Sequence, residues 1–452
     1  MKKINYSLVI FILLFSFSIQ AQTKKWTLEE CVKYAIDNNI SIKQTELDTK
    51  TAGIDKKGAI GNFIPSLNSN SSHSWNVGLN QDITTGLLRN QTTQFSSFGA
   101  GLNVDIYKGL QNQNTLRRAN LSIIAAKYQL TKMQEDVALN VANAFLQVLF
   151  NKENLKVQQE QKKINEKQLL RSEELVKAGS VPRGDLLDIK ATVAADNQRV
   201  IAAENALLIS KLSLAQLLQL KEFYDFDITD DTTAKDENNI LAQTPIAVYD
   251  KAKEKRTELK IAKTNLEIAE KNVAIAKGGY QPTLQGFYNI GTRISYADSF
   301  DFQTGTYKPA APFGQQFSNN RGQNFGAQLT IPIFNGFSAR NNVERSKVNL
   351  EKSKIAVEQE ELALQRNVYT AFTDAKGGLN AYESSLVALD ARQEAYNYAK
   401  EKYAVGMMNS FDFNQSQTLL SNAQSEVLRT KYDYIFKIKI LEFYFGIPII
   451  KN

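Results

Sequence analysis

Histidine and cysteine are almost absent from this sequence, whose 452 residues include one of each, His73 and Cys31. A disulfide requires two cysteines, and zinc sites or hydrolytic triads draw on several Cys or His side chains. No nucleophile, general base and orienting group stand at a recognisable spacing. The composition therefore favours a protein that is not an enzyme and that needs no metal or cofactor.

Long apolar runs are absent after the N-terminus. A start with two lysines precedes the apolar stretch Leu8–Phe17 and the small residue Ala21, which predicts a secretory signal peptide over residues 1–21. Cys31 lies beyond the predicted cleavage point, so no lipid anchor is expected. Further along, no stretch has about 18 consecutive apolar residues. If the mature chain enters a membrane, it must cross as β-strands.

A strong excess of charge is also lacking. The chain carries 54 Lys and Arg against 47 Asp and Glu, a formal net charge of +7, which falls to +5 without the two lysines of the signal peptide. The basic residues are spread along predicted helices and form no single patch. Nucleic acid is therefore not an expected partner.

One unit is present twice in the sequence. Residues of the first half match residues of the second half at a constant offset. The offset is 217 residues up to the first strands and 227 residues after them. Four such pairs are Gly61 and Gly278, Pro65 and Pro282, Gly179 and Gly406, and Asp185 and Asp412. The ten-residue difference falls in a longer loop around residues 295–321.

The duplication predicts four segments. After the signal peptide, the first repeat spans residues 22–220 and contains a helix, a strand pair, a long helix and a return helix. An acidic, solvated connection covers residues 221–243, and the second repeat spans residues 244–452.

Two segments of each repeat alternate like strands. In residues 95–107 one face is apolar, and the other carries Ser, Gly, Asn and Asp; the apolar positions are Phe98, Ala100, Leu102, Val104 and Ile106. The second repeat copies this face at Phe325, Ala327, Leu329, Ile331 and Ile333. A transmembrane barrel, with lipid outside and water inside, requires such a pattern. An amphipathic sheet that covers a soluble core shows the same pattern. The signal peptide and the repeat favour the membrane barrel, with interfacial aromatics at Trp75, Phe95, Tyr107, Phe325 and Phe334.

The remaining residues predict very long helices. Residues 109–178 contain no proline and repeat apolar residues three or four apart, which at 1.5 Å per residue gives roughly 105 Å, longer than a bilayer is thick. The chain breaks at Gly179 and Pro182 and returns over residues 184–218; the second repeat breaks at Gly406 in the same way. A soluble periplasmic coiled-coil scaffold would explain these helices equally well, but would leave the strand pairs unexplained.

Four strands cannot close a barrel. Open sheet edges in lipid would leave backbone groups unpaired, so copies must associate. Two copies would supply eight strands and three would supply twelve; the polar inner faces suit the wider, water-filled lumen of three. We therefore expect an α+β membrane protein with internal duplication, in which four transmembrane strands per chain join an oligomeric barrel that long helices continue beyond the membrane.

Three motifs give the chain a family resemblance. The opening Thr27-Leu28-Glu29-Glu30-Cys31 and the residues up to Asn39 resemble the leading helix of the TolC-like outer membrane efflux protein family, a TLEEAVxxALxNN pattern. The two hairpin turns after Gly179 and Gly406 resemble its GxxxxxDVLxA turns, and residues 441–448 resemble its closing segment. The order and spacing of these motifs extend the resemblance over nearly the whole mature chain.

The resemblance implies the outer membrane channel of a tripartite efflux system. It implies a homotrimer with a twelve-stranded barrel in the outer membrane of a Gram-negative bacterium, a helical tunnel across the periplasm, a periplasmic adaptor and an inner-membrane pump. The duct of a type I protein secretion system has the same architecture and stays an alternative.

The resemblance also implies which residues serve the periplasmic tip. Contact with the adaptor is assigned to Gly179, Pro182 and Gly406, and the candidate gate comprises Asp185, Asp188, Tyr403 and Asp412. Gln415 replaces the second acid of the second turn. For Asp185 and Asp412 the alternative is helix N-capping or a first-turn charge that complements the helix dipole.

Overall fold

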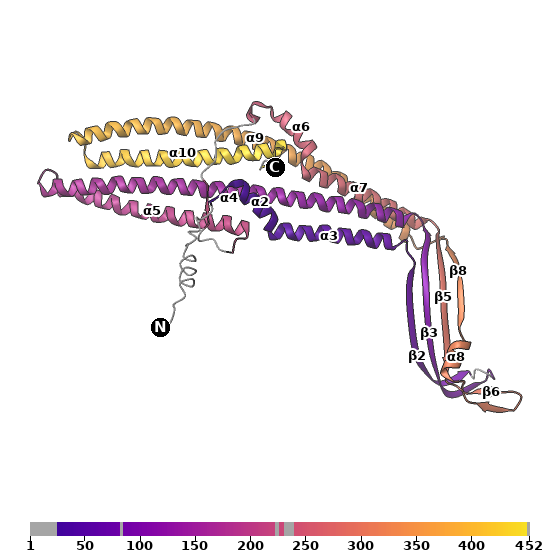
Figure 1. The fold of residues 1–452 in the computed structure, drawn as a ribbon. Helices are drawn as coiled ribbons and strands as arrows, with labels where there is room; N and C mark the ends of the chain where they lie inside the picture. Colours follow the sequence, from indigo (N-terminus) through magenta and orange to yellow (C-terminus); the bar gives the residue numbers. More distant parts are fainter. Residues whose placement is uncertain (1–24, 82–84, 222–225, 230–238, 450–452) are drawn as a thin grey trace, which may run out of the picture. The chain divides into compact units, whose positions relative to one another are not determined.

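The computed structural model describes residues 25–81, 85–221, 226–229 and 239–449 (Figure 1). The predicted signal peptide and part of the acidic connection lie outside these ranges. The elements follow in the order β1 (Lys25–Trp26), α2 (Leu28–Asn38), α3 (Ile40–Gly61), β2 (Ser66–Gln81), β3 (Leu88–Lys108), α4 (Gln111–Lys177), α5 (Arg183–Leu218), β4 (Asp227–Ile228), η1 (Ile240–Ala242), α6 (Pro245–Lys255), α7 (Thr257–Lys277), η2 (Gly278–Tyr280), β5 (Thr283–Ser295), β6 (Ser299–Asp301), β7 (Thr306–Lys308), α8 (Phe313–Asn319), β8 (Gly322–Thr330), α9 (Ser338–Ala404) and α10 (Ser410–Phe445).

The long helices and the return helices of the two halves have equal lengths. The long helices α4 and α9 have 67 residues each, and the return helices α5 and α10 have 36 each. At 1.5 Å per residue the long helices measure about 100 Å. The internal duplication is therefore present in the fold, while the boundaries predicted for the two repeats stay predictions.

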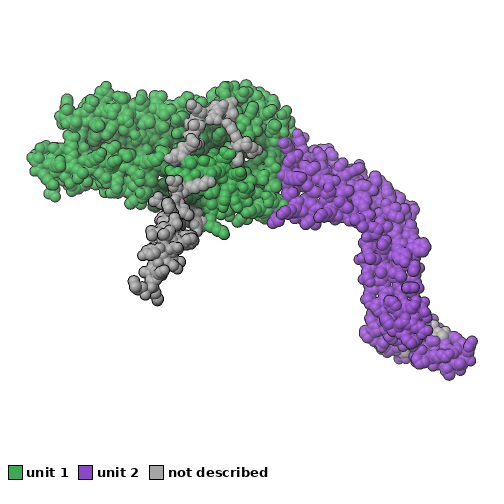
Figure 2. Space-filling view, viewed as in Figure 1, with its two compact units in different colours: residues 1–46, 129–259, 360–452 green, residues 47–128, 260–359 purple. Residues whose placement is uncertain are grey.

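The chain forms two compact units, and each of them draws on both halves of the sequence (Figure 2). Unit 1 comprises residues 1–46, 129–259 and 360–452, and unit 2 comprises residues 47–128 and 260–359. Unit 2 holds the large sheet together with residues 111–128 of α4 and 338–359 of α9. Unit 1 holds the rest of these two helices, which form hairpins with α5 and α10.

The large sheet of unit 2 is antiparallel, with the strand order β2-β3-β5-β8. Its cross-strand pairs form rows that run through all four strands. One row is apolar and consists of Leu67, Leu102, Tyr288 and Phe325. The next row points to the other face and consists of Asn68, Gly101, Asn289 and Asn324. The predicted alternation is confirmed, and one face is suited to lipid while the other is suited to water.

Two details of the sheet differ from the prediction. Strand β8 ends at Thr330, so Ile331 and Ile333 lie beyond it; Pro332 has no N–H to donate to a ladder, which explains the early end. Phe95 lies on the polar face, where Arg293 stacks over its ring at 4.0 Å, so its assignment to the lipid-facing aromatics is wrong. Side chains of a strand alternate between its two faces, and Phe95 is an even number of residues from Gly99 and Gly101, so it shares their polar face.

A β-bulge determines the position of another predicted aromatic. The register of β3 and β5 shifts between Asp105 and Tyr107, and Tyr107 thereby pairs with Leu284. Leu284 belongs to the apolar face, where it pairs with Leu329 of β8. The extra residue of the bulge thus places Tyr107 on the lipid-facing side, as predicted for an interfacial aromatic.

Unit 1 has its core where α2 meets α4 and α5. A capping box between Thr27 and Glu30 begins α2, and the buried face of this helix joins a cluster with Phe145, Leu149 and Leu214. Cys31 is fully buried in this cluster, and burial together with the nearby Glu30 charge raises the pKa of its thiol to about 12. Cys31 therefore acts as a small apolar core residue.

The acidic connection contributes to this core. β4 pairs in parallel with β1, and Phe226 and Ile228 are buried. Asp227 forms ion pairs with Lys152 of α4 at 3.3 Å and with Lys211 of α5 at 3.1 Å. The prediction of a solvated connection is therefore wrong for these residues, because two apolar side chains in a mostly acidic segment suffice to fasten it to the helices.

A buried cation joins the start of α7 to α4 and α10. Arg256 is 4% exposed, donates from Nη2 and Nε to Glu258 at 2.8 and 3.1 Å, and lies 3.8 Å over the ring of Phe443. Glu135 of α4 accepts from its Nη2 at 3.2 Å. Burial raises the pKa of Glu258, but the hydrogen bonds and charge of Arg256 outweigh burial and leave that pKa below its usual value.

The variant Glu258→Gln is expected to lose about 3 kcal/mol of stability at pH 7, because a buried cation loses its main counter-charge. Because the pKa of Glu258 is lower in the folded state, its carboxylate stabilises the fold at pH values above its unfolded-state pKa of about 4.3. This stabilisation is lost as the pH falls through the folded-state pKa. The deficit should therefore shrink at pH 3. Thermal unfolding in detergent at both pH values measures it. Glu426→Gln, which breaks the exposed Arg429 pair, is the control and should cost under about 1 kcal/mol.

Candidate channel entrance and conduit wall

The first hairpin turns at Gly179. This residue has a φ of +72°, a conformation that favours glycine, and its N–H donates to Val176 at 3.0 Å. The N–H of Ser180 donates to Leu175 at 2.9 Å, so the last carbonyls of α4 are satisfied. Pro182 follows in an extended conformation and stands immediately before α5. The turn is thus defined by the backbone, and Gly179 and Pro182 lie at its exposed surface.

The second hairpin turns at Gly406, whose φ is +78°. Here a side chain caps the return helix: Asn409 Oδ1 accepts from the N–H of Asp412 at 2.8 Å. The Nδ2 of Asn409 in turn donates to Asp412 Oδ2 at 2.9 Å. The spacing Asn409-x-x-Asp412 resembles a capping box and could have been found in the sequence.

The acidic residues of the candidate gate lie near the starts of the return helices. Asp185 is half-buried in the first turn of α5, whereas Asp188 and Asp412 are exposed. The N-cap positions belong to Pro182 and Asn409, so the capping alternative is wrong in its strict form. Asp185 and Asp412 do occupy first turns, where a negative charge complements the helix dipole.

Tyr403 joins the second hairpin to the first. Its ring stacks on Phe413 with centroids 4.6 Å apart and an interplanar angle of 7°. Its hydroxyl accepts a hydrogen bond from Gln168 Nε2 of α4 at 2.8 Å. Gln168 was not among the predicted site residues, since it is one of several glutamines on a polar helix and no local pattern marks it.

A second link between the hairpins lies further from the turns. Ser425 of α10 donates to Asn154 Oδ1 of α4 at 3.0 Å and accepts from Gln158 Nε2 at 3.4 Å. All three side chains are half-buried and uncharged. The polar links described between the hairpins are therefore neutral hydrogen bonds, each contributing about 1 kcal/mol.

One face of α5 carries an exposed apolar stripe. Leu187, Ile201 and Leu208 are 58%, 57% and 51% exposed and share a face, since their spacings are multiples of seven. In the described part of the chain, α5 is the one helix that is long and apolar enough to cross a membrane by length and composition. It is an arm of the first hairpin, in which Asn165 of α4 donates to Asp196 at 2.5 Å.

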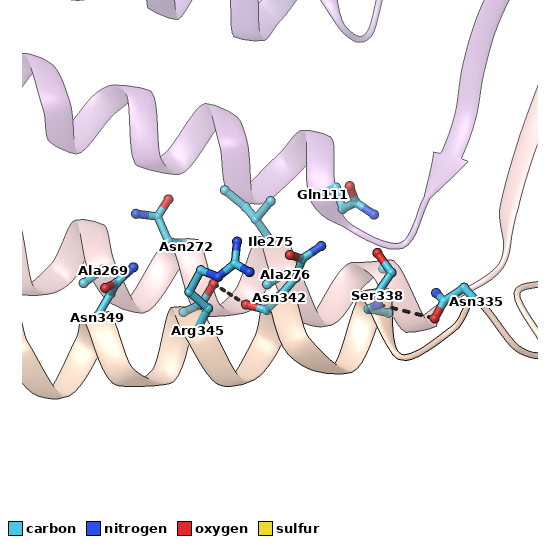
Figure 3. A pocket seen from close by; sticks show the side chains of 13 residues that line it. Gln111, Ala269, Asn272, Ile275, Ala276, Asn335, Ser338, Asn342, Arg345 and Asn349 are labelled. Carbon is cyan, nitrogen blue, oxygen red and sulfur yellow. Dashed lines mark hydrogen bonds between the residues drawn. The ribbon is translucent and has the colours of Figure 1, made fainter.

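The helices next to the sheet form a wall with a polar groove (Figure 3). A cavity of about 560 Å³ lies between α7 and α9 below the start of α4. Asn335, Asn342 and Asn349 line it at intervals of seven residues, and Asn272 and Arg345 face it as well. This side of the wall is therefore wet.

The other faces of α9 complete the wall. Lys347, Lys354 and Glu358 are exposed on a second polar face, and Val343 is buried on the packed side. Opposite Val343, exposed Val348 and Ile355 form an apolar edge, about 140° and 120° around the helix from it. A helix that is polar on two sides and apolar on the edges is suited to a wall with water on both sides.

In the ranges that the structure describes, no cluster of three or more His, Cys, Asp or Glu could hold a metal ion.

Known proteins share this sequence and fold. The family model described as outer membrane efflux protein matches residues 32–219 and 248–439. Outer membrane protein TolC of Escherichia coli is 22% identical over 308 residues, which cover 67% of this chain and 59% of that protein, so the chain matches under two thirds of its length.

Solved structures agree over more of the chain. The outer membrane protein VceC of Vibrio cholerae superposes with a TM-score of 0.75 at 14% identity, covering 93% of this chain and 96% of that one. The open state of the MtrE outer membrane channel of Neisseria gonorrhoeae has a TM-score of 0.72 at 16% identity, covering 95% and 92%.

These matches establish the location and class of the chain. The predicted fold is confirmed, with transmembrane strands continued by long helices, and the family match shows that the protein lies in the outer membrane. The soluble-scaffold hypothesis is wrong, because this family match assigns the chain to the outer membrane. From the extent of the family match, this chain belongs to the outer membrane efflux protein family.

Proposed function

We propose that this chain is the outer membrane channel of a tripartite efflux system and conducts substrates passively to the exterior. The observation that carries the proposal is the pair of adjacent rows across the sheet, one apolar and one polar, continued by helices with two wet faces. Such a wall encloses water and supplies no energy. The energy comes from an inner-membrane pump, and a periplasmic adaptor connects the pump to the channel.

The working channel is a homotrimer. β2 and β8 are the edge strands of the sheet, and an unpaired edge in lipid costs several kcal/mol per backbone group. The edge of β8 in one copy pairs with the edge of β2 in the next, and three copies close a barrel of twelve strands around a water-filled lumen.

The helices that follow these edges support the same association. α3 enters β2 and carries exposed Leu47 and Ile54, seven residues apart, on the side away from buried Ala52 and Ala59. α9 leaves the loop after β8 and carries Val348 and Ile355, also seven apart. Apolar stripes at heptad spacing on the two outer helices are suited to coiled-coil packing between neighbouring copies.

The candidate gate is the contact between the hairpin tips. Tyr403 and Gln168 keep the second hairpin against the first, and Asp185, Asp188 and Asp412 add negative charge near the turns. In a trimer these acids would repel one another around the axis and favour dilation. The neutral hydrogen bond opposes that motion, so the entrance rests closed and opens when the adaptor binds.

The adaptor docks at the hairpin turns and along α5. Gly179, Pro182 and Gly406 are exposed at the turns. The adjoining stripe of Leu187, Ile201 and Leu208 provides apolar surface at the heptad spacing that a partner helix requires.

A deletion strain tests the function. We expect the strain to become several-fold more sensitive to dyes, detergents and antibiotics, because these compounds would no longer be exported. Its secreted proteins should stay unchanged. The two measurements separate efflux from protein secretion, since the two kinds of channel differ only in cargo. Minimal inhibitory concentrations and the proteins in the culture medium are measured together. Complementation with the wild-type gene is the control. Loss of a secreted protein with unchanged drug sensitivity would instead establish a type I secretion duct.

A further inference from the structure

The helix α8 lies in the long loop between β5 and β8, beside the end of the sheet (Figure 1). Strand β8 begins at Gly322, opposite Gly291, so Thr292–Ser295 of β5 has no β8 partner. α8 takes that place. Four hydrogen bonds fasten it there: Thr292 Oγ1 to Phe317 O at 3.1 Å, Gln316 Nε2 to Ser295 O at 2.9 Å, Ser295 N to Gln316 Oε1 at 3.0 Å, and Asn320 Nδ2 to Arg293 O at 2.7 Å. Backbone groups that the end of β8 would otherwise leave open are thereby satisfied.

The aromatic side of α8 continues the lipid-facing surface of the sheet. Phe313 and Phe317 lie one turn apart and stack at 5.9 Å. Both rings contact Phe98, at 6.0 and 5.7 Å, and Phe98 pairs with Thr292 on the apolar face. Phe313 and Phe317 are nevertheless 48% and 43% exposed. Their free halves therefore extend the surface that lipid covers.

The composition around α8 is unusual for a surface loop. Residues 309–320 contain no charged side chain, while Lys308 and Arg321 stand at the two ends. Arg321 is exposed and forms no ion pair within the described ranges. Lys308 is ion-paired with Asp301, so the charge available to lipid is that of Arg321. An uncharged amphipathic segment that ends at an exposed cation matches the boundary between acyl chains and anionic headgroups.

Neighbouring residues on the same face indicate the same depth. His73 Nδ1 and Ser96 Oγ lie 2.7 Å apart, and Ser96 Oγ and the Tyr296 hydroxyl lie 3.1 Å apart. The ring of Trp75, which is 59% exposed, meets His73 edge-on at 4.2 Å. Rings with both apolar surface and polar atoms gather where a membrane meets water.

We propose that α8 is an interfacial helix, which inserts Phe313 and Phe317 into the outer leaflet at the level of the headgroups. Its partner is the lipid surface itself, and Arg321 faces the lipid phosphates. The helix anchors the barrel at a defined depth and covers the end of β5 where β8 is short. The inference rests on the membrane location of the sheet and is independent of the proposed pump and adaptor.

Tryptophan quenching tests the proposal. Because the chain has two tryptophans, Phe317→Trp is made in a Trp26→Phe, Trp75→Phe background, so that it is the single emitting tryptophan. The purified channel is reconstituted in vesicles of phosphatidylcholine brominated either near the headgroup or deep in the acyl chain. We expect shallow bromine to quench the new fluorescence by at least half and deep bromine to quench it clearly less. Phe313→Trp repeats the measurement and guards against a misplaced single variant.

Two controls make the outcome decisive. Phe302→Trp, in the same background, changes a ring that is 71% exposed next to β6 and should stay unquenched. Trp75 in a Trp26→Phe background should be quenched, because it lies on the lipid-facing sheet. Quenching of Trp75 without quenching at either α8 position would overturn the proposal and show that water or a neighbouring copy covers α8. If Trp75 also stayed unquenched, the orientation of the whole sheet would be overturned.

Discussion

Replacing Ile355 by aspartate is expected to abolish the trimer. Ile355 is 53% exposed on the apolar edge of α9, and each copy would bury an unpaired carboxylate against the next. Burial of Ile contributes about 2 kcal/mol, and an unpaired buried charge costs several more. With three such contacts per assembly, we expect the fraction of trimer in detergent to fall at least tenfold. Native mass spectrometry and sedimentation velocity measure it.

The adjacent residue supplies the matched control. Ala356 is exposed and lies about 100° around α9 from Ile355, away from the apolar edge. Ala356→Asp adds the same charge and should stay trimeric. Ile54→Asp on α3 should reproduce the loss, since Ile54 belongs to the complementary stripe. A trimer that tolerates both Ile355→Asp and Ile54→Asp would refute the proposed contact between α3 and α9.

Removing the hydroxyl of Tyr403 is expected to open the entrance. Tyr403→Phe keeps the stacking on Phe413 and deletes the acceptor of the Gln168 hydrogen bond. One neutral hydrogen bond contributes about 1 kcal/mol, so three equivalent bonds in a concerted transition contribute about 3 kcal/mol. This difference shifts the ratio of open to closed states about 150-fold. Single-channel recordings in planar bilayers should show a correspondingly higher open probability.

A double variant tests whether the hydrogen bond between Gln168 and Tyr403 is the contact that keeps the entrance closed. Gln168→Leu should open the channel to a similar degree, and the double variant should add little, because both changes remove one bond. Tyr398→Phe, at a residue of α9 that is 67% exposed, is the control and should leave the recordings unchanged. Open probabilities in Tyr403→Phe that equal those of the wild type would exclude this bond from the gate.

Local periodicity determined much of the fold. The 3.6-residue repeat without proline marked helices of about the observed length, and Gly179 and Gly406 marked the turns, because only a positive φ closes them so tightly. The twofold alternation assigned the residues of the apolar face, and unpaired edges in lipid made association a requirement. Each of these conclusions depends on a residue and its near neighbours, which the sequence contains.

Only the tertiary structure decided which distant residues meet. Gln168 and Tyr403 stand 235 positions apart, and nothing near either one indicates the other. Strand pairing likewise placed Phe95 beneath Arg293, and the short β8 made room for α8 beside β5. The burial of Phe226 and Ile228 in the acidic connection likewise follows from the pairing of β4 with β1, which the sequence does not indicate. The physical reason is common to all of them: register, bulges and packing are set by free energy shared across elements, whereas periodicity is a property of one element alone.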